Sequence, residues 1–570
     1  MSFDGKKLIA EFQTPLPESM LLEYDFFDLY PNDGGGGFVM RQELPASSDR
    51  AITDLILYHD GLGNYGTLPK IDYHKFDSWS TIERASWINR VYFIPSLARI
   101  ARLDRNSDLA KLIVATLLEL HRNSAPPKTA AAAQFLDVET IRRRNEEYNQ
   151  GKGGNKSISY QWYDFQPSSR LIYIIQALGF LRQMDCLTDV EADELAQMVF
   201  THAQVIYWQE MTAPYRWGNH QALRALAMIY GGCFCHDRDF LTLGIKRMNE
   251  HILADFAQDG LLLEASPTYH CLETWIARDA CYLAEKYGFE LDKQAVERFE
   301  KAASTTRLLC RPDNRLTVLN DGCNLNCLPF IATLPAVKTE AVKEHDWLEN
   351  NRIAIWRTEK WYLLMDMSHF TGQFSHYHAG KNALNIWYQD APFIVDSGCC
   401  DYDAPEFKAY FKNGEAHASL LVDGMGDGKV QGAYDWLHFA SLTSTPWQDN
   451  CISGRLTSTV PSWAGVVWER TLNTKNDHLE ITDIITADKA HQYEFIYPLH
   501  PDVRAIFAEN QIRLVNGSAE LLMAFDSNHL LTIGLRPALW CDGTDILPTR
   551  AIRVMLNNDN IKLKCSITHL

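Results

Sequence analysis

The feature that most constrains the fold of this chain is a change of hydrophobic pattern part-way along it. From about residue 80 to about residue 310, apolar residues recur with the spacing of amphipathic helices, between short segments rich in Gly, Pro, Asn or Asp. After about residue 346 they form short β-rich runs, bounded by turn signals such as Asp423-Gly424 and Asn516-Gly517. The pattern predicts a domain of helical hairpins followed by an antiparallel β-sandwich.

The predicted elements can be assigned to residue ranges. We expect helices over 81–103, 108–122, 168–184, 188–209, 220–230, 241–258, 267–287 and 293–309. We expect strands over 353–357, 361–366, 383–388, 393–396, 418–422, 465–472, 478–487 and 529–534. With 570 residues the chain is long enough for two large domains. We expect the boundary within 331–350, and we take 1–335 as the helical domain and 336–570 as the sandwich.

Composition limits the class of protein and its compartment. Apolar residues at 46% and charged residues at 22% are typical of a folded globular protein. No apolar run reaches the roughly 18 residues of a membrane span, and no apolar segment follows the N-terminal lysines as in a signal peptide. The thirteen cysteines are scattered, which favours free thiols. We therefore expect a cytoplasmic protein, or a periplasmic or secreted one if a signal peptide has been removed.

The net charge bears on the partners of the protein. A charge of −18 argues against nucleic acid as a partner, because nucleic-acid binding proteins present a basic face. It does not exclude an acidic substrate, since a polyanion needs only a locally positive cleft.

The first candidate site segment lies where a loop enters the helix predicted from about Gln221. Asn219 and His220 stand at this point, and the N–H groups of a helix N-terminus favour anions, so a substrate carboxylate can dock there. The alternative is that Asn219 only caps the helix and His220 belongs to the core. The preceding Tyr215-Arg216-Trp217 resembles an aromatic loop on which a sugar ring can stack.

The second candidate segment is Glu264 to His270. Ser266-Pro267 is a typical helix start, so Tyr269 is expected near the third helical position, with its hydroxyl exposed at the helix mouth. The alternative for an aromatic residue at this position is core packing.

The third candidate segment contains His376 and His378. On a strand, two residues that are two apart point to the same face. Asp396 ends a later apolar run and His417 precedes another strand. Two histidines and one carboxylate from neighbouring strands form a known zinc arrangement. The alternative is a pair of exposed loop histidines.

Taken together and in this order, these segments resemble the heparinase II/III-like superfamily of polysaccharide lyases. The most specific stretches are 376–378, 383–388, 393–398 and 416–424, together with Tyr410. The Asn219-His220 pair and the spacing of Glu264, Tyr269 and His270 form a weaker match. The resemblance covers both halves of the chain. It implies an incomplete (α/α) toroid before the sandwich, and an activity on uronate-containing acidic polysaccharides or oligosaccharides.

The resemblance also implies roles for individual residues. Asn219, with His220 beside it, would neutralise the uronate carboxylate, Tyr269 would be the catalytic tyrosine, and His376 would remove or guide the C5 proton. His378, Asp396 and His417 would bind one divalent metal ion with a structural role, zinc by ligand type, or else Mn²⁺ or Ca²⁺. We expect substrate contacts from Arg170, Arg216, Trp217, Glu264, His270 and Tyr410.

Elimination chemistry explains why these residue types are needed. The C5 proton is weakly acidic, so hydrogen bonds must stabilise the developing enediolate. A tyrosine with an ordinary pKa near 10 needs positive neighbours to act as a base, and His220, His270, His376, Arg170 and Arg216 are candidates. In glucuronate or mannuronate one tyrosine can take the proton and return it to the leaving oxygen. In iduronate or guluronate a second base is needed on the opposite face, and we expect His376 across the cleft from Tyr269.

Other functions fit parts of the pattern. A glycoside hydrolase on a helical toroid would need two carboxylates flanking the bond, for which Glu264, Asp164 and Asp321 are candidates. A cupin-like metalloenzyme would need a glutamate shortly after His378, where the chain has Ala379 to Asn382. A non-catalytic glycan binder would not need Asn219, Tyr269 and His376. Among lyase substrates, the glycosaminoglycans hyaluronan, chondroitin sulfate and heparan sulfate come first, and alginate or another polyuronate next.

Overall fold

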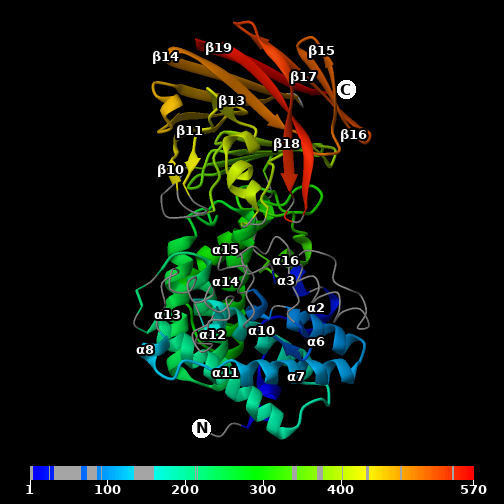
Figure 1. The fold of residues 1–570 in the computed structure, drawn as a ribbon, viewed down its shortest axis with the longest axis vertical. Coiled ribbons are helices and arrows are strands. Elements are labelled where there is room, and N and C mark those ends of the chain that lie inside the picture. The colour runs from blue at the N-terminus through cyan, green and yellow to red at the C-terminus, as the bar shows by residue number, and fades with distance from the viewer. Residues whose placement is uncertain are drawn as a thin grey trace. The chain divides into compact units, whose positions relative to one another are not determined.

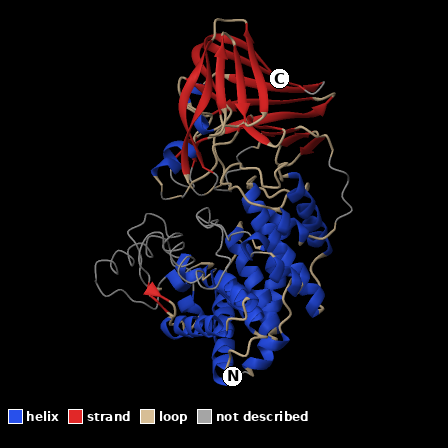
Figure 2. Ribbon diagram, turned by 90° about the vertical axis from the view of Figure 1, so that its right-hand side faces the viewer, coloured by secondary structure: helices blue, strands red, loops and turns tan. Residues whose placement is uncertain are grey.

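The structure is a computed structural model, and its described residues form helices in the first half of the chain and antiparallel strands in the second (Figures 1 and 2). It describes residues 4–24, 26–30, 66–73, 87–91, 93–133, 160–162, 164–211, 213–214, 216–336, 343–368, 376–400, 402, 404–431, 436–475, 478–541, 543 and 545–570. The chain divides into two compact units. The first contains 1–256, 271–300 and 329–334, and the second contains 257–270, 301–328 and 335–570.

The helices lie close to the ranges that the sequence predicts. The predicted first helix is described only in part, as the short helix η2 (Trp87–Arg90) followed by α6, because residues 81–86 lie outside the described residues. The α-helices are α1 (Gly5–Glu11), α2 (Glu18–Glu23), α3 (Phe26–Leu29), α6 (Phe93–Leu103), α7 (Ser107–Asn123), α8 (Ala130–Ala133), α10 (Gln166–Leu181), α11 (Asp189–Glu210), α12 (Asn219–Cys235), α13 (Arg238–Asp255), α14 (Pro267–Tyr287), α15 (Lys293–Leu308) and α16 (Leu328–Ala332).

Local sequence and packing explain the helical unit. Thr188 and Glu191 form a capping box at the start of α11, in which each side chain bonds the backbone N–H of the other residue. Every residue of α10 is buried, its polar side chains included. The close approach of α12 and α13 requires glycine at position 232. A Cβ atom there would lie only 2.7 Å from the backbone nitrogen of Leu241. The helix α12, whose first residue is Asn219, thus packs against α10, α11 and α13.

Among the described helices, none combines the length and the apolar character needed to cross a membrane. The first unit also has a hairpin of β1 (Gly66–Thr67) and β2 (Lys70–Ile71), and a short helix η4 (Tyr160–Trp162).

Within the described residues, the second unit contains a five-stranded antiparallel sheet with the order β3-β4-β5-β6-β7. A larger sheet has the order β11-β12-β13-β14-β19-β17-β16-β15, with β8 paired to β14 and β18 paired to β19. The strands are β3 (His345–Leu348), β4 (Ile353–Arg357), β5 (Trp361–Asp366), β6 (Ala383–Tyr388), β7 (Ala391–Ile394), β8 (Leu420–Val422), β9 (Lys429–Val430), β10 (Trp436–His438), β11 (Ala440–Gln448), β12 (Cys451–Ser458), β13 (Val467–Lys475), β14 (His478–Pro498), β15 (Arg504–Ala508), β16 (Gln511–Asn516), β17 (Ala519–Ser527), β18 (Thr532–Cys541) and β19 (Ile546–His569).

One hydrophobic core joins the two sheets. It includes Trp356 and Trp361 from the small sheet and Trp468 and Phe495 from the large one. The rings of Trp356 and Trp361 stack with their centroids 5.6 Å apart. Burying a large apolar side chain stabilises a fold by on the order of 3 kcal/mol, so this layer is the main source of stability of the unit.

Two segments that precede the strands in sequence pack on the small sheet, whose central strands β5 and β6 are buried on both faces. The segment 257–270 accepts hydrogen bonds at the Leu262 carbonyl from Asn351 (2.8 Å) and at the Leu263 carbonyl from Tyr377 (3.1 Å). In the segment 301–328, the Leu308 carbonyl accepts a bond from Arg357 (2.9 Å). These contacts bring Tyr269 and Asp321 into the same unit as His376, although the predicted domain 1–335 contains the first two.

The cysteines differ in part from the expectation of free thiols. Cys310 and Cys327 form a disulfide, so that expectation is wrong for this pair. The other eleven cysteines, all within the described residues, are not in a disulfide.

Candidate active site

The first turn of α14 fixes the position of Tyr269. Ser266 precedes the helix, and its hydroxyl accepts a hydrogen bond from the Tyr269 N–H (3.4 Å) and donates one to the Asp321 carbonyl (2.7 Å). Pro267 occupies the first helical position, where its missing N–H has no cost. Tyr269 is therefore the third residue of the helix, which confirms the prediction from the sequence.

The side chain of Tyr269 is buried, with 1% of its surface exposed, so the prediction of an exposed hydroxyl is wrong. Its hydroxyl lies 2.8 Å from the hydroxyl of Tyr402. Its ring stacks on the imidazole of His376, with centroids 3.7 Å apart and planes 22° apart. The stacking places His376 directly against Tyr269, and not on the far side of a cleft as expected from the stereochemistry.

Asp321 is the centre of this cluster. Its Oδ2 accepts hydrogen bonds from Nδ1 of His376 (2.7 Å) and from the hydroxyl of Tyr402 (3.1 Å). Its Oδ1 accepts from Nε2 of His378 (2.6 Å) and from the thiol of Cys399 (3.6 Å). Both oxygens are thus engaged, and one carboxylate orients two histidines and a tyrosine.

Electrostatics keep Asp321 ionised. Burial alone would raise its pKa, but the charge of Lys412 and the hydrogen bonds from His376 and His378 hold the pKa well below its ordinary value. The ammonium of Lys412 lies 3.9 Å from Oδ1 and is fully buried, and this burial lowers its pKa. Burial also lowers the pKa of His378 to about 4, so His378 is neutral near pH 7.

An ionised Asp321 determines what His376 can do. Because the carboxylate only accepts, Nδ1 of His376 carries the hydrogen of their bond, and Nε2 is the nitrogen that can take up a proton. Nε2 lies 3.7 Å from Oε2 of Glu264, which is also buried. The structure thus brings Glu264, Tyr269 and His376 together, with two further partners: Tyr402, which has no sequence signal, and Asp321, which the sequence suggests only as a hydrolase carboxylate.

The backbone around His376 and His378 is irregular, so the prediction that both lie on a strand is wrong. The two rings still meet at one carboxylate, because Asn320 and Asp321 bind this segment. The amide oxygen of Asn320 accepts from the His378 N–H (3.0 Å), and the Asp321 N–H donates to the His376 carbonyl (3.2 Å). Tertiary hydrogen bonds take the place of a strand ladder here.

A second cluster lies at the start of α12 in the helical unit. The helix begins at Asn219, two residues before the predicted Gln221, and Gly218 occupies the cap position, so Asn219 is not the cap. Nδ1 of His220 lies 2.5 Å from Oδ2 of Asp164. The ring of His220 packs on Phe165, with centroids 4.0 Å apart. Both candidate residues are therefore in the first helical turn.

Asp164 contacts His220 directly and is part of a network of ion pairs with Arg224, Glu210 and Arg247. Burial would raise the pKa of Asp164, but His220 and Arg224 outweigh it and hold the pKa well below its ordinary value. Arg224 bonds both Asp164 and Glu210, and Glu210 also lies 3.2 Å from Arg247. An ionised Asp164 keeps a proton on Nδ1 of His220. The sequence analysis considered Asp164 only as a hydrolase carboxylate.

The residues just before α12 are accessible. Trp217 is 45% exposed, and Arg216 is exposed as well. Arg216 also contributes to the low pKa of Asp164. Both side chains therefore lie on the surface of the protein.

Two predicted substrate contacts are wrong because the side chains are fully buried. Arg170 bonds Nε2 of His202 (2.7 Å) and the carbonyls of Asn89 (2.9 Å) and Gln161 (2.6 Å). His270 bonds the Ala302 carbonyl (3.1 Å), and burial lowers its pKa to about 3. A neutral, enclosed His270 is not a positive neighbour for Tyr269.

The hydroxyl of Tyr410 lies outside the hydrogen-bonded cluster of Tyr269. It lies 3.2 Å from the hydroxyl of Ser397, whereas Tyr402 is the residue that reaches Tyr269. Tyr402 carries no motif of its own, so only the fold could identify it.

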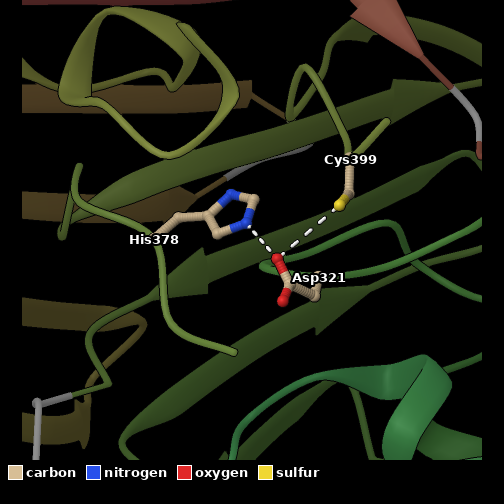
Figure 3. Close-up of side chains that lie close together, drawn as sticks. All are labelled: Asp321, His378 and Cys399. Atoms are coloured by element: carbon tan, nitrogen blue, oxygen red, sulfur yellow. Dashed lines mark hydrogen bonds and ion pairs between the residues drawn. The ribbon is translucent and has the colours of Figure 1, made fainter. Parts of the chain in front are cut away.

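The predicted metal ligands lie near one another, with the ring centroids of His378 and His417 5.4 Å apart, but they are bonded to different partners. Nδ1 of His417 lies 2.8 Å from Oδ2 of Asp396, while Nε2 of His378 bonds Asp321. Among the described residues, two other buried groups have ligand atoms close enough to hold a metal ion: Asp321, His378 and Cys399 (Figure 3), and His251, Asp255 and Glu273. One observation fits the predicted site, because Nδ1 of His378 is buried with no hydrogen-bond partner.

Comparison with known proteins assigns both halves of the chain. Residues 43–333 match the family described as heparinase II/III N-terminus, and residues 342–569 match heparinase II/III-like, C-terminal. A search of curated proteins finds no match.

Several solved structures share the fold. A heparinase III structure aligns with a TM-score of 0.72 at 12% identity, over 99% of this chain and 89% of that one. The heparan sulfate lyase HepC from Pedobacter heparinus aligns with a TM-score of 0.61 at 14% identity, over 97% and 87%. The chondroitin AC lyase of Streptomyces coelicolor A3, in complex with chondroitin sulphate, aligns with a TM-score of 0.51 at 9% identity, over 99% and 82%. These structural alignments establish a common fold. The low sequence identities leave the substrate open.

Proposed function

The chain belongs to the heparinase II/III-like family, and on this premise we propose that it cleaves uronate-containing acidic glycans by β-elimination. The observation that carries the proposal is the hydrogen-bonded cluster of Tyr269, Tyr402, His376 and Asp321. It joins a phenol to an imidazole whose proton position is fixed by an ionised carboxylate. Such an arrangement serves proton transfer to and from a substrate.

In the proposed reaction the C5–H bond breaks and its proton goes to a base. The electron pair forms the C4–C5 double bond, the bond from C4 to the leaving oxygen breaks, and that oxygen takes up a proton. We assign base and acid to Tyr269 on substrates where both atoms lie on one face. Asn219 and His220 would hydrogen-bond the carboxylate as its charge develops, and Arg216 and Trp217 would contact the glycan.

The stacked ring of His376 gives it a role beside Tyr269. Asp321 orients Nδ1 of His376 and accepts from Tyr402, which in turn reaches the Tyr269 hydroxyl. His376 can therefore influence the ionisation of the Tyr269 hydroxyl in two ways, by direct stacking and through this hydrogen-bonded path. We propose that His376 favours the phenolate of Tyr269 and can itself accept a proton at Nε2, on the same side as Tyr269.

The cluster is less suited to hydrolysis. A glycoside hydrolase needs one carboxyl group that holds a proton and a second carboxylate. Asp321 accepts four hydrogen bonds and its pKa is held low, so it cannot be the acid. The same hydrogen bonds occupy both oxygens of the buried Asp321, so it is not available as the second carboxylate beside Glu264 either.

The substrate is tested by a panel of hyaluronan, chondroitin sulfates, heparan sulfate, heparin and alginate, read by the ultraviolet absorbance of the unsaturated product. The similar structures include lyases named for heparan sulfate and chondroitin, so we propose a glycosaminoglycan first and alginate or another polyuronate as the alternative. Absorbance rising with a glycosaminoglycan supports the proposal. Cleavage without a rise in absorbance contradicts it.

Asn219→Ala is expected to lower kcat by about 10²- to 10³-fold with little change in KM, because the hydrogen bond to the carboxylate strengthens as charge develops. Steady-state kinetics on the best substrate measures both constants. Asn219→Asp, which keeps the size and adds a negative charge, is expected to raise KM as well. An Asn219→Ala effect confined to KM would reduce its role to substrate binding.

The proposal includes one divalent metal ion with a structural role, zinc by ligand type. His378 would bind it through Nδ1, since Nε2 is bonded to Asp321, and Asp396 and His417 would complete the protein ligands. No step of the reaction above depends on this ion.

We expect purified protein to contain about one metal ion per chain, and a chelator to lower the thermal midpoint, because the ion would tie three segments of the second unit together. Elemental analysis and thermal unfolding measure this. His417→Ala is expected to lose both the ion and the chelator effect. The metal proposal would be contradicted by metal-free protein whose thermal midpoint does not change when a chelator is added.

A further inference from the structure

A buried carboxylate anchors the start of α12. The N–H of Gly218 donates a hydrogen bond of 2.7 Å to Oδ2 of Asp255, the last residue of α13. Gly218 has a φ of 95°, which favours glycine, and the chain bends there just before Asn219. The bond therefore fixes the residue that immediately precedes the first helical turn of α12.

Asp255 is also bonded to His251, which in turn lies beside Glu273. Nδ1 of His251, one turn earlier on α13, lies 3.0 Å from the same Oδ2. Nε2 of His251 lies 3.5 Å from Oε2 of Glu273 on α14. The three side chains are 0% to 1% exposed. Hydrogen bonds to a buried carboxylate are stronger than those in water, so Asp255 has little freedom to move.

None of these three side chains takes part in the proposed reaction. Their contacts lead through Asp255 to the backbone N–H of Gly218, the residue before Asn219. A hydrogen bond at this point sets where the Asn219 and His220 side chains emerge. Displacing a substrate-positioning group by about 1 Å can lower a rate on the order of 10²-fold.

We infer that Asp255 is a positioning residue: its hydrogen bond to the Gly218 N–H holds Asn219 and His220 where they bind the substrate carboxylate, with His251 and Glu273 as its supports. The kinetic part of this inference rests on the proposed function, whereas the structural part does not.

The test compares Asp255→Ala, which removes the acceptor, with Asp255→Asn, which keeps an oxygen for the Gly218 N–H. Hydrogen exchange of a peptide covering residues 217–223, read by mass spectrometry, reports the structural effect in the full chain. Kinetics on the best glycan of the panel report the functional effect. Asp237→Ala is the matched control, because Asp237 caps the other end of α13 by accepting from the Asp239 and Phe240 N–H groups.

We expect Asp255→Ala to speed exchange in the 217–223 peptide and to lower kcat by about 10- to 100-fold with KM nearly unchanged. Asp255→Asn and the control should match the wild type in both measurements. Unchanged exchange in Asp255→Ala would overturn the inference, and so would a loss of kcat in Asp255→Asn equal to that in Asp255→Ala.

The outcomes separate this inference from the proposed function. If the wild type forms no unsaturated product on any glycan, the proposed function fails, and the exchange data alone decide whether Asp255 holds the start of α12. If Asp255→Ala does not fold, Gly218→Ala tests the same geometry, because alanine disfavours the φ of 95° at which the Gly218 N–H reaches Asp255, and it should give the same two effects. A stoichiometric metal ion that is lost in Asp255→Asn would assign His251, Asp255 and Glu273 to metal binding and overturn the inference.

Discussion

Replacing Tyr269 by phenylalanine is expected to lower kcat by about 10³-fold or more, because one hydroxyl supplies both the base and the acid of the elimination. The phenyl ring keeps the stacking on His376, and the hydroxyl of Tyr402 keeps its bond to Asp321. The lost hydrogen bond to Tyr402 is expected to reduce the free energy of unfolding by only about 1 kcal/mol. Steady-state kinetics and thermal unfolding measure the two effects separately.

Tyr410→Phe is the matched control for Tyr269→Phe. It removes a hydroxyl that lies against Ser397 and outside the Tyr269 cluster, so its kcat should stay close to that of the wild type. A folded Tyr269→Phe enzyme with substantial activity would remove Tyr269 from the chemistry. Tyr410→Phe as inactive as Tyr269→Phe would restore the role that the resemblance implies for Tyr410.

His376→Ala is expected to lower kcat/KM by about 10²- to 10⁴-fold, the usual contribution of a general base. Because His376 stacks on Tyr269 and shares Asp321 with Tyr402, we expect a loss on both uronate epimers. The measurement compares matched substrates, glucuronate against iduronate or mannuronate against guluronate.

His376→Gln serves as the comparison for His376→Ala, because it keeps a polar side chain that can still bond Asp321 but cannot act as a base. A loss in His376→Ala confined to iduronate or guluronate would show that His376 acts only as the opposite-face base. Wild-type activity in His376→Gln would show that its role is to fill space and bond Asp321.

Much of the fold could be predicted because hydrophobic periodicity is a local property. The strands β4, β5 and β6 coincide with the predicted ranges 353–357, 361–366 and 383–388. The helix start at Ser266-Pro267 also placed Tyr269 in the correct turn, since capping depends on neighbouring residues. Features encoded within one turn or one strand are visible in a single sequence.

The partners of the candidate residues could not be predicted in the same way. Tyr402 is 133 residues from Tyr269, and Asp321 is 55 residues from His376, so only the tertiary fold brings them together. Burial was misjudged for the same reason. Arg170 looked like a cation for substrate binding, but the fold surrounds it with backbone carbonyls and His202.

The strand predicted through His376 and His378 shows how non-local contacts can replace local structure. The two-residue spacing fits a strand, but the side chains of Asn320 and Asp321 bind this segment in an irregular conformation. A period of two over three residues is too short to specify a strand.

The central claim, that the chain breaks its substrate by elimination, is tested most directly by the mass of the products formed in ¹⁸O-labelled water. A uronate-containing oligosaccharide of defined length is incubated with the wild type and with Tyr269→Phe, and the fragments are analysed by mass spectrometry and ultraviolet absorbance. Elimination predicts one fragment that is lighter by one water molecule than the hydrolysis product and absorbs in the ultraviolet. Neither fragment should contain ¹⁸O from the solvent. With Tyr269→Phe, neither fragment should form. Fragments that together gain one labelled water would show hydrolysis and contradict the account.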